Sequence, residues 1–161
     1  MSATALPTAA PVGADTWLLE LGPQSTLLRP AQAGAAPAPL RWPAVVATLR
    51  HAPPTALEIE RAIEQVEDAV MPLRARLPAA LRLASADPLL HTLARHAGPL
   101  DDPAWLPSDA VERLFDRLAA RAQGRPATHD ALPVDAPHAA ALVLLRELLH
   151  HWGLDGIALH G

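Results

Sequence analysis

Proline is the residue that most tightly constrains how this chain can fold. The sequence has 18 prolines among 161 residues, against an ordinary frequency of roughly 5%. Proline lacks a backbone N–H and clashes with the preceding helical turn, so it is excluded from helix interiors and central strands. The prolines cluster between segments that have a hydrophobic period. We therefore expect short helices and strands joined by proline-rich loops.

Four segments between these prolines have the pattern of amphipathic helices. The clearest begins at Thr55, because Thr55 and Glu58 match the capping box and Pro72 then interrupts the helix. Its apolar stripe at helical spacing consists of Ile59, Ile63, Val66 and Val70. The other predicted helices cover 87–98, 108–124 and 135–152, with Asp87, Ser108 and Asp135 as their N-caps.

Strands are predicted mainly near the two ends of the chain. Residues 16–21 and 25–30 flank Gly22-Pro23-Gln24, which predicts a β-hairpin. A last strand at 157–159 is expected to pair with this hairpin. Residues 30–41 are typical of a loop, 42–52 fit a short helix better than a strand, and 81–86 fit either a strand or an extended link. The predicted fold class is α+β and predominantly helical, with about four to five helices packed against a small sheet.

Length and composition predict one folded domain. Half of the residues are apolar, which is enough for a substantial core, and only 3% are aromatic. We expect residues 1–13, rich in Ala, Thr and Pro, to be a disordered tail and residues 14–161 to form the domain. The net charge of −4 argues against a nucleic-acid partner. The absence of cysteine, of a signal peptide and of a long apolar run favours a cytoplasmic protein without membrane contact.

Several residue types and motifs are missing, and each absence excludes a kind of chemistry. The sequence has no lysine, asparagine, tyrosine or cysteine, and all 13 basic residues are arginine, which is the pattern expected from a GC-rich genome. Schiff-base chemistry, P-loop nucleotide binding, thiol nucleophiles and thiolate metal sites are therefore excluded. No dinucleotide fingerprint, nucleophile elbow or HExxH motif occurs, and no cofactor is predicted.

The stretch RELLHHWGLDG at 146–156 most resembles a functional site. Successive residues of a helix are about 100° apart, so Arg146, Glu147, His150 and His151 share one arc. They are candidate ligand-binding residues, and Glu147 with His150 is a candidate metal pair of the E-x-x-H type. The alternative is an ordinary solvated helix end, since a histidine there is also favoured by the helix dipole. Ala139, Ala140, Val143 and Leu144 occupy the same arc one or two turns earlier, so this arc changes from apolar to polar along the helix.

Two further features suggest an interaction surface. Glu60, Glu64 and Glu67 lie on one face of the first predicted helix, where they form either a solvated face or a docking surface for a basic partner. Trp105, beside an acidic loop, is either an exposed anchor for a partner or a side chain packed under its own loop. Both features point to a protein partner or to self-association.

The missing motifs and the amphipathic helices together favour a non-enzymatic accessory or protein-interaction domain, possibly a homodimer. Two alternatives stay open. One is a small-molecule or metal-binding module that uses the arc at 146–151. The other is a hydrolase that relies on histidine and carboxylates alone.

Overall fold

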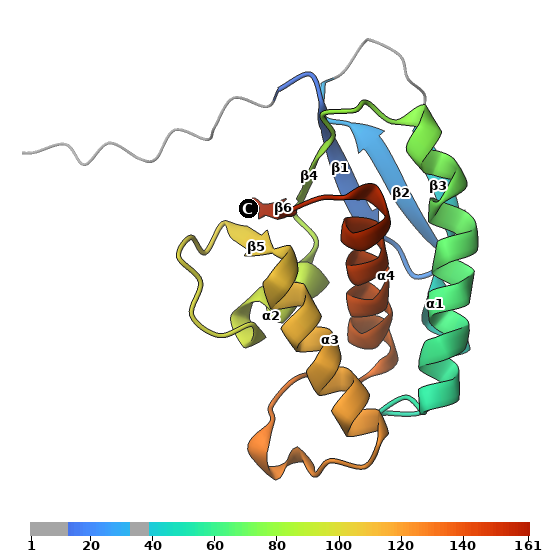
Figure 1. Ribbon diagram of the computed structural model, residues 1–161, viewed down its shortest axis with the longest axis vertical. Coiled ribbons are helices and arrows are strands. Elements are labelled where there is room, and N and C mark those ends of the chain that lie inside the picture. Colours follow the sequence, from blue (N-terminus) through green and yellow to red (C-terminus); the bar gives the residue numbers. More distant parts are fainter. Residues whose placement is uncertain (1–12, 33–38) are drawn as a thin grey trace, which may run out of the picture.

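A six-stranded mixed sheet organises the molecule. The computed structural model describes residues 13–32 and 39–161, and in this part of the chain the strand order is β3-β2-β1-β4-β6-β5. Figure 1 shows the strands behind a layer of helices. The strands are β1 (Thr16–Leu21), β2 (Ser25–Pro30), β3 (Leu40–Pro43), β4 (Arg82–Ser85), β5 (Trp105–Pro107) and β6 (Gly156–Leu159).

The centre of the sheet is parallel and its two sides are antiparallel. Strand β4 pairs in parallel with both β1 and β6. The hairpin β1–β2 continues antiparallel into β3, and β5 pairs antiparallel with β6 at the other edge. Parallel neighbours need a crossover connection, and this chain uses helices for it. The carboxyl ends of β1, β4 and β6 therefore meet at one edge of the sheet.

The four predicted helices are confirmed in the described residues, with small shifts at their ends. They are α1 (Ala56–Val70), α2 (Pro88–His96), α3 (Ser108–Ala122) and α4 (Ala136–Trp152), with short 3₁₀ turns η1 (Val45–Thr48), η2 (Pro72–Arg76) and η3 (Ala127–His129). Thr55 and Glu58 form both hydrogen bonds of the capping box. Asp87 and Asp135 cap α2 and α4 as expected. Ser108 is instead the first residue of α3, which has no side-chain cap.

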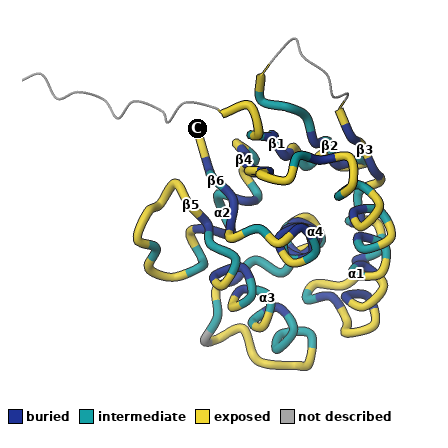
Figure 2. Tube along the Cα trace, turned by 45° about the horizontal axis from the view of Figure 1, so that its top comes forward, coloured by how far each residue is buried: buried dark blue, intermediate teal, exposed yellow. Residues whose placement is uncertain are grey.

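Helix α4 lies in the middle of the core. It packs against α1, α2 and α3, and Figure 2 shows it surrounded by other elements of the chain. Its residues 139–145 and 147–149 are all buried. Strand β1 contributes alternating buried residues, Trp17 and Leu19, to the same core. The helix is therefore apolar on all sides until its last two turns. This agrees with the predicted change from apolar to polar residues along one arc of the helix.

The predicted fold class is wrong in the size and pairing of the sheet. The fold is α/β, with a mixed sheet of six described strands instead of a small sheet of hairpin and C-terminal strand. Residues 40–43, expected to be loop and helix, form edge strand β3, where Leu40 and Trp42 are buried in alternation. Pro43 is tolerated there because an edge strand leaves some N–H positions unpaired. Only the four residues of η1 become helical in the segment 42–52.

The other two differences concern non-local pairing. Strand β5 has three residues, which are too few to show a period of two. The C-terminal strand pairs with β4 and β5, not with the hairpin, because β4 occupies the position beside β1. The prediction of a disordered tail over 1–13 falls, apart from Gly13, outside the described residues. Among the helices of the described residues, none is long and apolar enough to cross a membrane.

The capping box of α1 leads to a pH-dependent prediction. Glu58 accepts hydrogen bonds from the N–H groups of Thr55 and Arg50 and faces the His51 ring, each at 2.9 Å. The Thr55 bond and then His51 lower the pKa of Glu58 from its ordinary 4.5 to about 2. The carboxylate therefore stabilises the fold above pH 4.5, and this contribution is lost as the pH falls towards 2. In acid unfolding monitored by circular dichroism, Glu58→Gln should remove part of that pH dependence, whereas Glu60→Gln should leave it unchanged.

Candidate functional site

The carboxyl edge of the parallel strands is the place where this kind of fold usually binds ligands. Three structural features meet there. Strand β1 ends in the turn Gly22-Pro23-Gln24, strand β4 leads directly into α2, and β6 ends beside them at His160. The N-terminal half of α4 lies next to this edge and contributes Pro137, which lines a cavity together with the turn.

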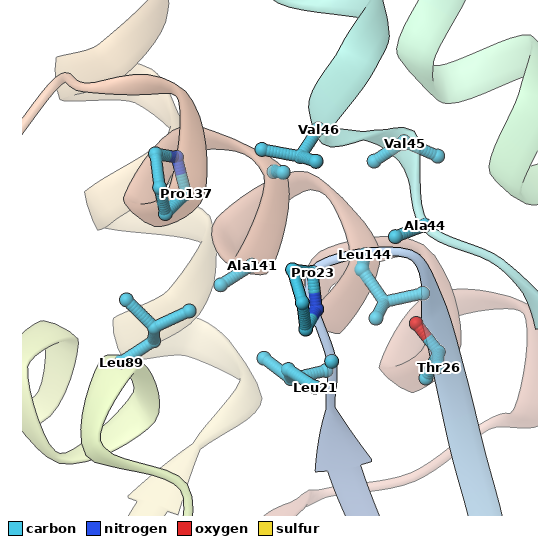
Figure 3. Close-up of a pocket in the computed structure, with 12 residues that line it drawn as sticks. Leu21, Pro23, Thr26, Ala44, Val45, Val46, Leu89, Pro137, Ala141 and Leu144 are labelled. Carbon is cyan, nitrogen blue, oxygen red and sulfur yellow. The ribbon is translucent and has the colours of Figure 1, made fainter.

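A cavity of about 270 Å³ opens at this edge, and its wall is largely apolar. Figure 3 shows side chains from the hairpin, from η1, from α2 and from α4 around it. The lining residues are Leu21, Gly22, Pro23, Thr26, Ala44, Val45, Val46, Leu89, Pro137, Ala140, Ala141 and Leu144. Thr26 is the polar side chain among them. Its residue is only 3% exposed, and its hydroxyl makes no hydrogen bond to any residue in the described ranges.

The turn that closes this cavity needs glycine at position 22. The Gly22 N–H donates to the Ser25 carbonyl at 3.0 Å, and a Cβ at Gly22 would lie 2.7 Å from that same oxygen. Ala44 donates its N–H to the Gln24 carbonyl at 3.0 Å and so ties the turn to the segment before η1. The turn and the wall of the cavity are thus held together by backbone bonds.

Ser85 and Asp87 fasten β1, β4 and α2 to one another. The buried Ser85 hydroxyl donates to the Leu19 carbonyl at 2.7 Å and accepts the Asp87 N–H. One carboxylate oxygen of Asp87 accepts from Leu21 at 3.1 Å, and the other caps α2 through Leu89 at 2.9 Å. Their hydrogen-bonding groups are used inside the fold, so they position the edge of the sheet and do not face the cavity.

One cation lies close to the turn on the other side of strand β2. Arg41 of β3 donates from Nη1 to the Ser25 hydroxyl at 2.7 Å. This arginine is exposed, and among the described residues it has no carboxylate partner. Arg29, by contrast, pairs with Glu20 at 2.7 Å. Arg41 is therefore available to an anion that approaches the hairpin turn.

The four residues predicted at the end of the last helix do not line this cavity. They follow Leu144, the last residue of α4 that lines it. Arg146 pairs with Glu112 at 3.1 Å and with Glu147 at 2.7 Å, and its guanidinium lies 4.6 Å from the centre of the Phe115 ring. These contacts, despite partial burial, raise the pKa of Arg146 and keep it charged.

The structure separates His150 from Glu147 and brings His151 to it. His150 is exposed and lines a second cavity of about 480 Å³ with Arg146. The other residues of that cavity are Ser108, Asp109, Val111, Glu112, Leu149, Gly153, Leu154 and Asp155. His151 Nε2 lies 3.3 Å from Glu147 Oε2 and 3.0 Å from Glu67 Oε1. Ligand binding by the predicted set, and metal binding by Glu147 with His150, stay predictions.

The predicted interaction surface is distributed over separate parts of the molecule. Glu60 and Glu64 are exposed on α1, whereas the half-buried Glu67 turns towards α4. Trp105 is 37% exposed on β5, at the far edge of the sheet from the α1 side in Figure 1. Its ring packs over Gly156, where a Cβ would lie 2.6 Å from it. A protein partner for these residues stays a prediction.

Asp130, in the loop between α3 and α4, has a structural role. It accepts two hydrogen bonds from Arg117, at 2.6 and 3.0 Å, and one from the Leu132 N–H at 2.9 Å. The Arg117 bonds contribute most to lowering the pKa of Asp130 to about 2. The aspartate thereby fastens the loop after α3 to that helix.

Sequence reasoning missed the cavity at the carboxyl edge. The hairpin was predicted. The parallel pairing of β1, β4 and β6, which places the hairpin turn beside a cavity at their carboxyl ends, was not predicted. The signal in the sequence was the alternation of β2, which places the polar Thr26 on the same face as the buried Leu28. A polar residue at a core position of a strand is a reason to look for a ligand or a partner group.

Comparison with known proteins supports the fold and not a family membership. No family model matches the chain, and no curated protein matches its sequence. Solved structures do match. A Ppx/GppA family protein from Aquifex aeolicus has a TM-score of 0.66 at 15% identity, covering 91% of this chain and 52% of that one.

Two further solved structures have the same fold. The type II variant of the A. aeolicus Ppx/GppA phosphatase has a TM-score of 0.68 at 15% identity, with 92% of this chain and 54% of that one covered. An exopolyphosphatase-like protein has a TM-score of 0.53 at 16% identity, with 92% and 55% covered. The chain thus spans about half the length of these proteins. This finding corrects the expectation of a non-enzymatic accessory or interaction domain, since the solved proteins that share the fold include phosphatases.

Proposed function

We propose that this chain is a hydrolase domain that acts on phosphate esters or phosphoanhydrides, with its substrate bound at the carboxyl edge of β1, β4 and β6. The observation that carries the proposal is the shared fold over about nine tenths of this chain with Ppx/GppA phosphatases. Polyphosphate is the first substrate to test, because one of the similar structures is of an exopolyphosphatase-like protein. We also place the domain in the cytoplasm, in agreement with its lack of cysteine.

The hairpin turn supplies groups that can bind phosphate. The Thr26 hydroxyl can donate a hydrogen bond to a phosphate oxygen, and it has no competing partner among the described residues. Arg41 is held beside Ser25 at the same hairpin, but on the opposite, exposed face of the sheet from Thr26, so its positive charge lies outside the cavity. The wall of the cavity is largely apolar, so in this proposal the charged phosphates are bound at the turn and not inside the cavity.

The residues of the cavity wall cannot activate water for hydrolysis. Its lining residues include neither a carboxylate nor an imidazole. Hydrolysis adds water to phosphorus and releases the leaving oxygen with a proton, so it needs a base and a charge-stabilising group. The residues of the cavity wall supply neither of these groups, and the assay includes Mg²⁺ because a divalent cation could supply the charge stabilisation.

Phosphate release tests this proposal directly. The purified protein is incubated with Mg²⁺ and with polyphosphate, pyrophosphate or p-nitrophenyl phosphate. At least one substrate should be turned over, and Thr26→Val should lower kcat/KM about tenfold, the typical cost of a hydrogen bond to a charged group. Thr92→Val on α2, where the hydroxyl accepts a hydrogen bond from Arg95 and does not line the cavity, serves as the matched control and should keep full activity. Absence of turnover with all three substrates would contradict the proposal, as would equal loss in both variants.

A further inference from the structure

A cluster of three potential metal ligands lies between α1 and α4, away from the carboxyl edge. Glu147 and His151 come from α4, and Glu67 comes from α1. Glu147 is only 1% exposed and is one of four buried polar or charged residues among those described. A buried carboxylate is costly unless charged or polar partners surround it. The surroundings of Glu147 therefore indicate what this cluster is built to hold.

Two of the three separations between donor atoms are close to those of a zinc coordination sphere. His151 Nε2 lies 3.0 Å from Glu67 Oε1 and 3.3 Å from Glu147 Oε2, and all three donor atoms lie within 4.8 Å of one another. A tetrahedral zinc ion has its nitrogen and oxygen ligands at about 2.0–2.1 Å, which places neighbouring ligands about 3.3 Å apart. A single imidazole N–H cannot point well at two carboxylates at once, whereas an imidazole lone pair and two carboxylates can share one cation.

The neighbouring charges orient the cluster and leave it negative. Arg146 donates to Oε1 of Glu147 at 2.7 Å and leaves Oε2 directed at His151. The same guanidinium also pairs with Glu112. Arg146 thus contacts two carboxylates, and Glu67 is a third carboxylate that it does not contact, so with a neutral imidazole these four charged residues carry two negative charges in excess. A divalent cation would balance this charge, and the arginine would be the outer contact that fixes the ligand carboxylate.

We propose that Glu67, Glu147 and His151 bind a zinc ion that links α1 to α4. One imidazole with two carboxylates suits zinc better than magnesium or calcium, which prefer six or more oxygen ligands. Glu67 is 37% exposed in its side chain, so an ion can enter from solvent on that side. Glu147 follows the cavity-lining Leu144 by three positions in α4, but none of the three cluster residues lines the cavity at the carboxyl edge. The proposal therefore goes beyond the proposed hydrolase function and does not depend on it.

Metal binding by the full chain tests this proposal. Chelator-treated protein is titrated with Zn²⁺ against a chromophoric competitor, and Co²⁺ is used as a spectroscopic probe. We expect one equivalent of zinc, a rise in Tm of several degrees and the intense visible absorption of tetrahedral cobalt. His151→Ala should weaken zinc binding at least tenfold, whereas the adjacent His150→Ala, whose ring points into the second cavity, should not.

A second pair of variants separates binding from folding. Glu67→Gln changes an accessible ligand and keeps the side-chain size, and Glu64→Gln changes an exposed neighbour on the same helix. Only Glu67→Gln should weaken zinc binding, and both variants should keep the circular dichroism spectrum of the unmodified protein. Three outcomes would overturn the site: no zinc bound, equal affinity in all four variants, or loss in His150→Ala alone. Each would leave the cluster as an ion-pair network between the two helices.

Discussion

Replacement of Leu145 by alanine should destabilise the protein by about 3 kcal/mol, in the range of 2–5 kcal/mol found for large-to-small core changes. Leu145 is 0% exposed and lies in the middle of α4, the helix that packs against the other three. The substitution removes buried methyl groups and leaves a cavity between helices that cannot close around it, because α4 is held on several sides. For a domain of this size, Tm should fall by about 10 °C.

Urea unfolding followed by circular dichroism measures this effect. Leu57→Ala is the control, since Leu57 is 53% exposed at the start of α1 and should change stability by no more than about 0.5 kcal/mol. The slope of the unfolding transition should stay the same in both variants, as expected when the fold is unchanged. If the two leucine variants were equally stable, α4 would not be the centre of the core.

Replacement of Gly156 by alanine should be the other severe change, with a loss of about 2–3 kcal/mol from overpacking. A Cβ at position 156 would lie 2.6 Å from the Leu106 carbonyl oxygen and 2.6 Å from the Trp105 ring. The carbonyl belongs to β5, which is paired with β6 in this region, so it cannot move without disturbing the edge of the sheet. The tryptophan would have to leave its place over the glycine.

The Trp105 ring makes this change observable without unfolding the protein. Gly156→Ala should lower the urea midpoint and also alter the tryptophan fluorescence of the native state, because Trp105 becomes more exposed. Gly161→Ala, where no atom lies within 4 Å of the added Cβ, should change neither. A Gly156→Ala protein with unaltered stability would show that β5 is not held against β6 in solution.

The cluster of Glu67, Glu147 and His151 could not be predicted from the spacing of residues within one helix. The helical pattern predicted one arc of the last helix for Arg146, Glu147, His150 and His151. It favoured His150 as the partner of Glu147 because the E-x-x-H spacing is a known metal motif. In the structure the partner is His151, at the i, i+4 position, because α1 lies on that side of α4 and presents Glu67 to it. Nothing in the spacing within α4 could reveal which side α1 would cover.

Two strands of the sheet were also not predicted from the sequence. Strand β3 was missed because its buried Leu40 and Trp42 are separated by an exposed arginine and followed by proline, which together give too short a pattern. The three residues of β5 acquire their strand conformation from β6, about fifty positions later. The expectation of a non-enzymatic domain depended on the absence of motifs, and motifs do not report a fold that is shared at about 15% identity.

The sequence by itself determined the four helices, the caps of three of them, the hairpin and the apolar character of the first half of α4. These features arise from contacts between residues at most a few positions apart, such as the bonds between Thr55 and Glu58. The tertiary structure alone decided the parallel pairing of β1, β4 and β6, the cavity at their carboxyl edge and the meeting of Glu67 with His151, which are 84 positions apart. Such contacts depend on how whole helices and strands pack, because burial of their apolar faces sets which distant residues become neighbours.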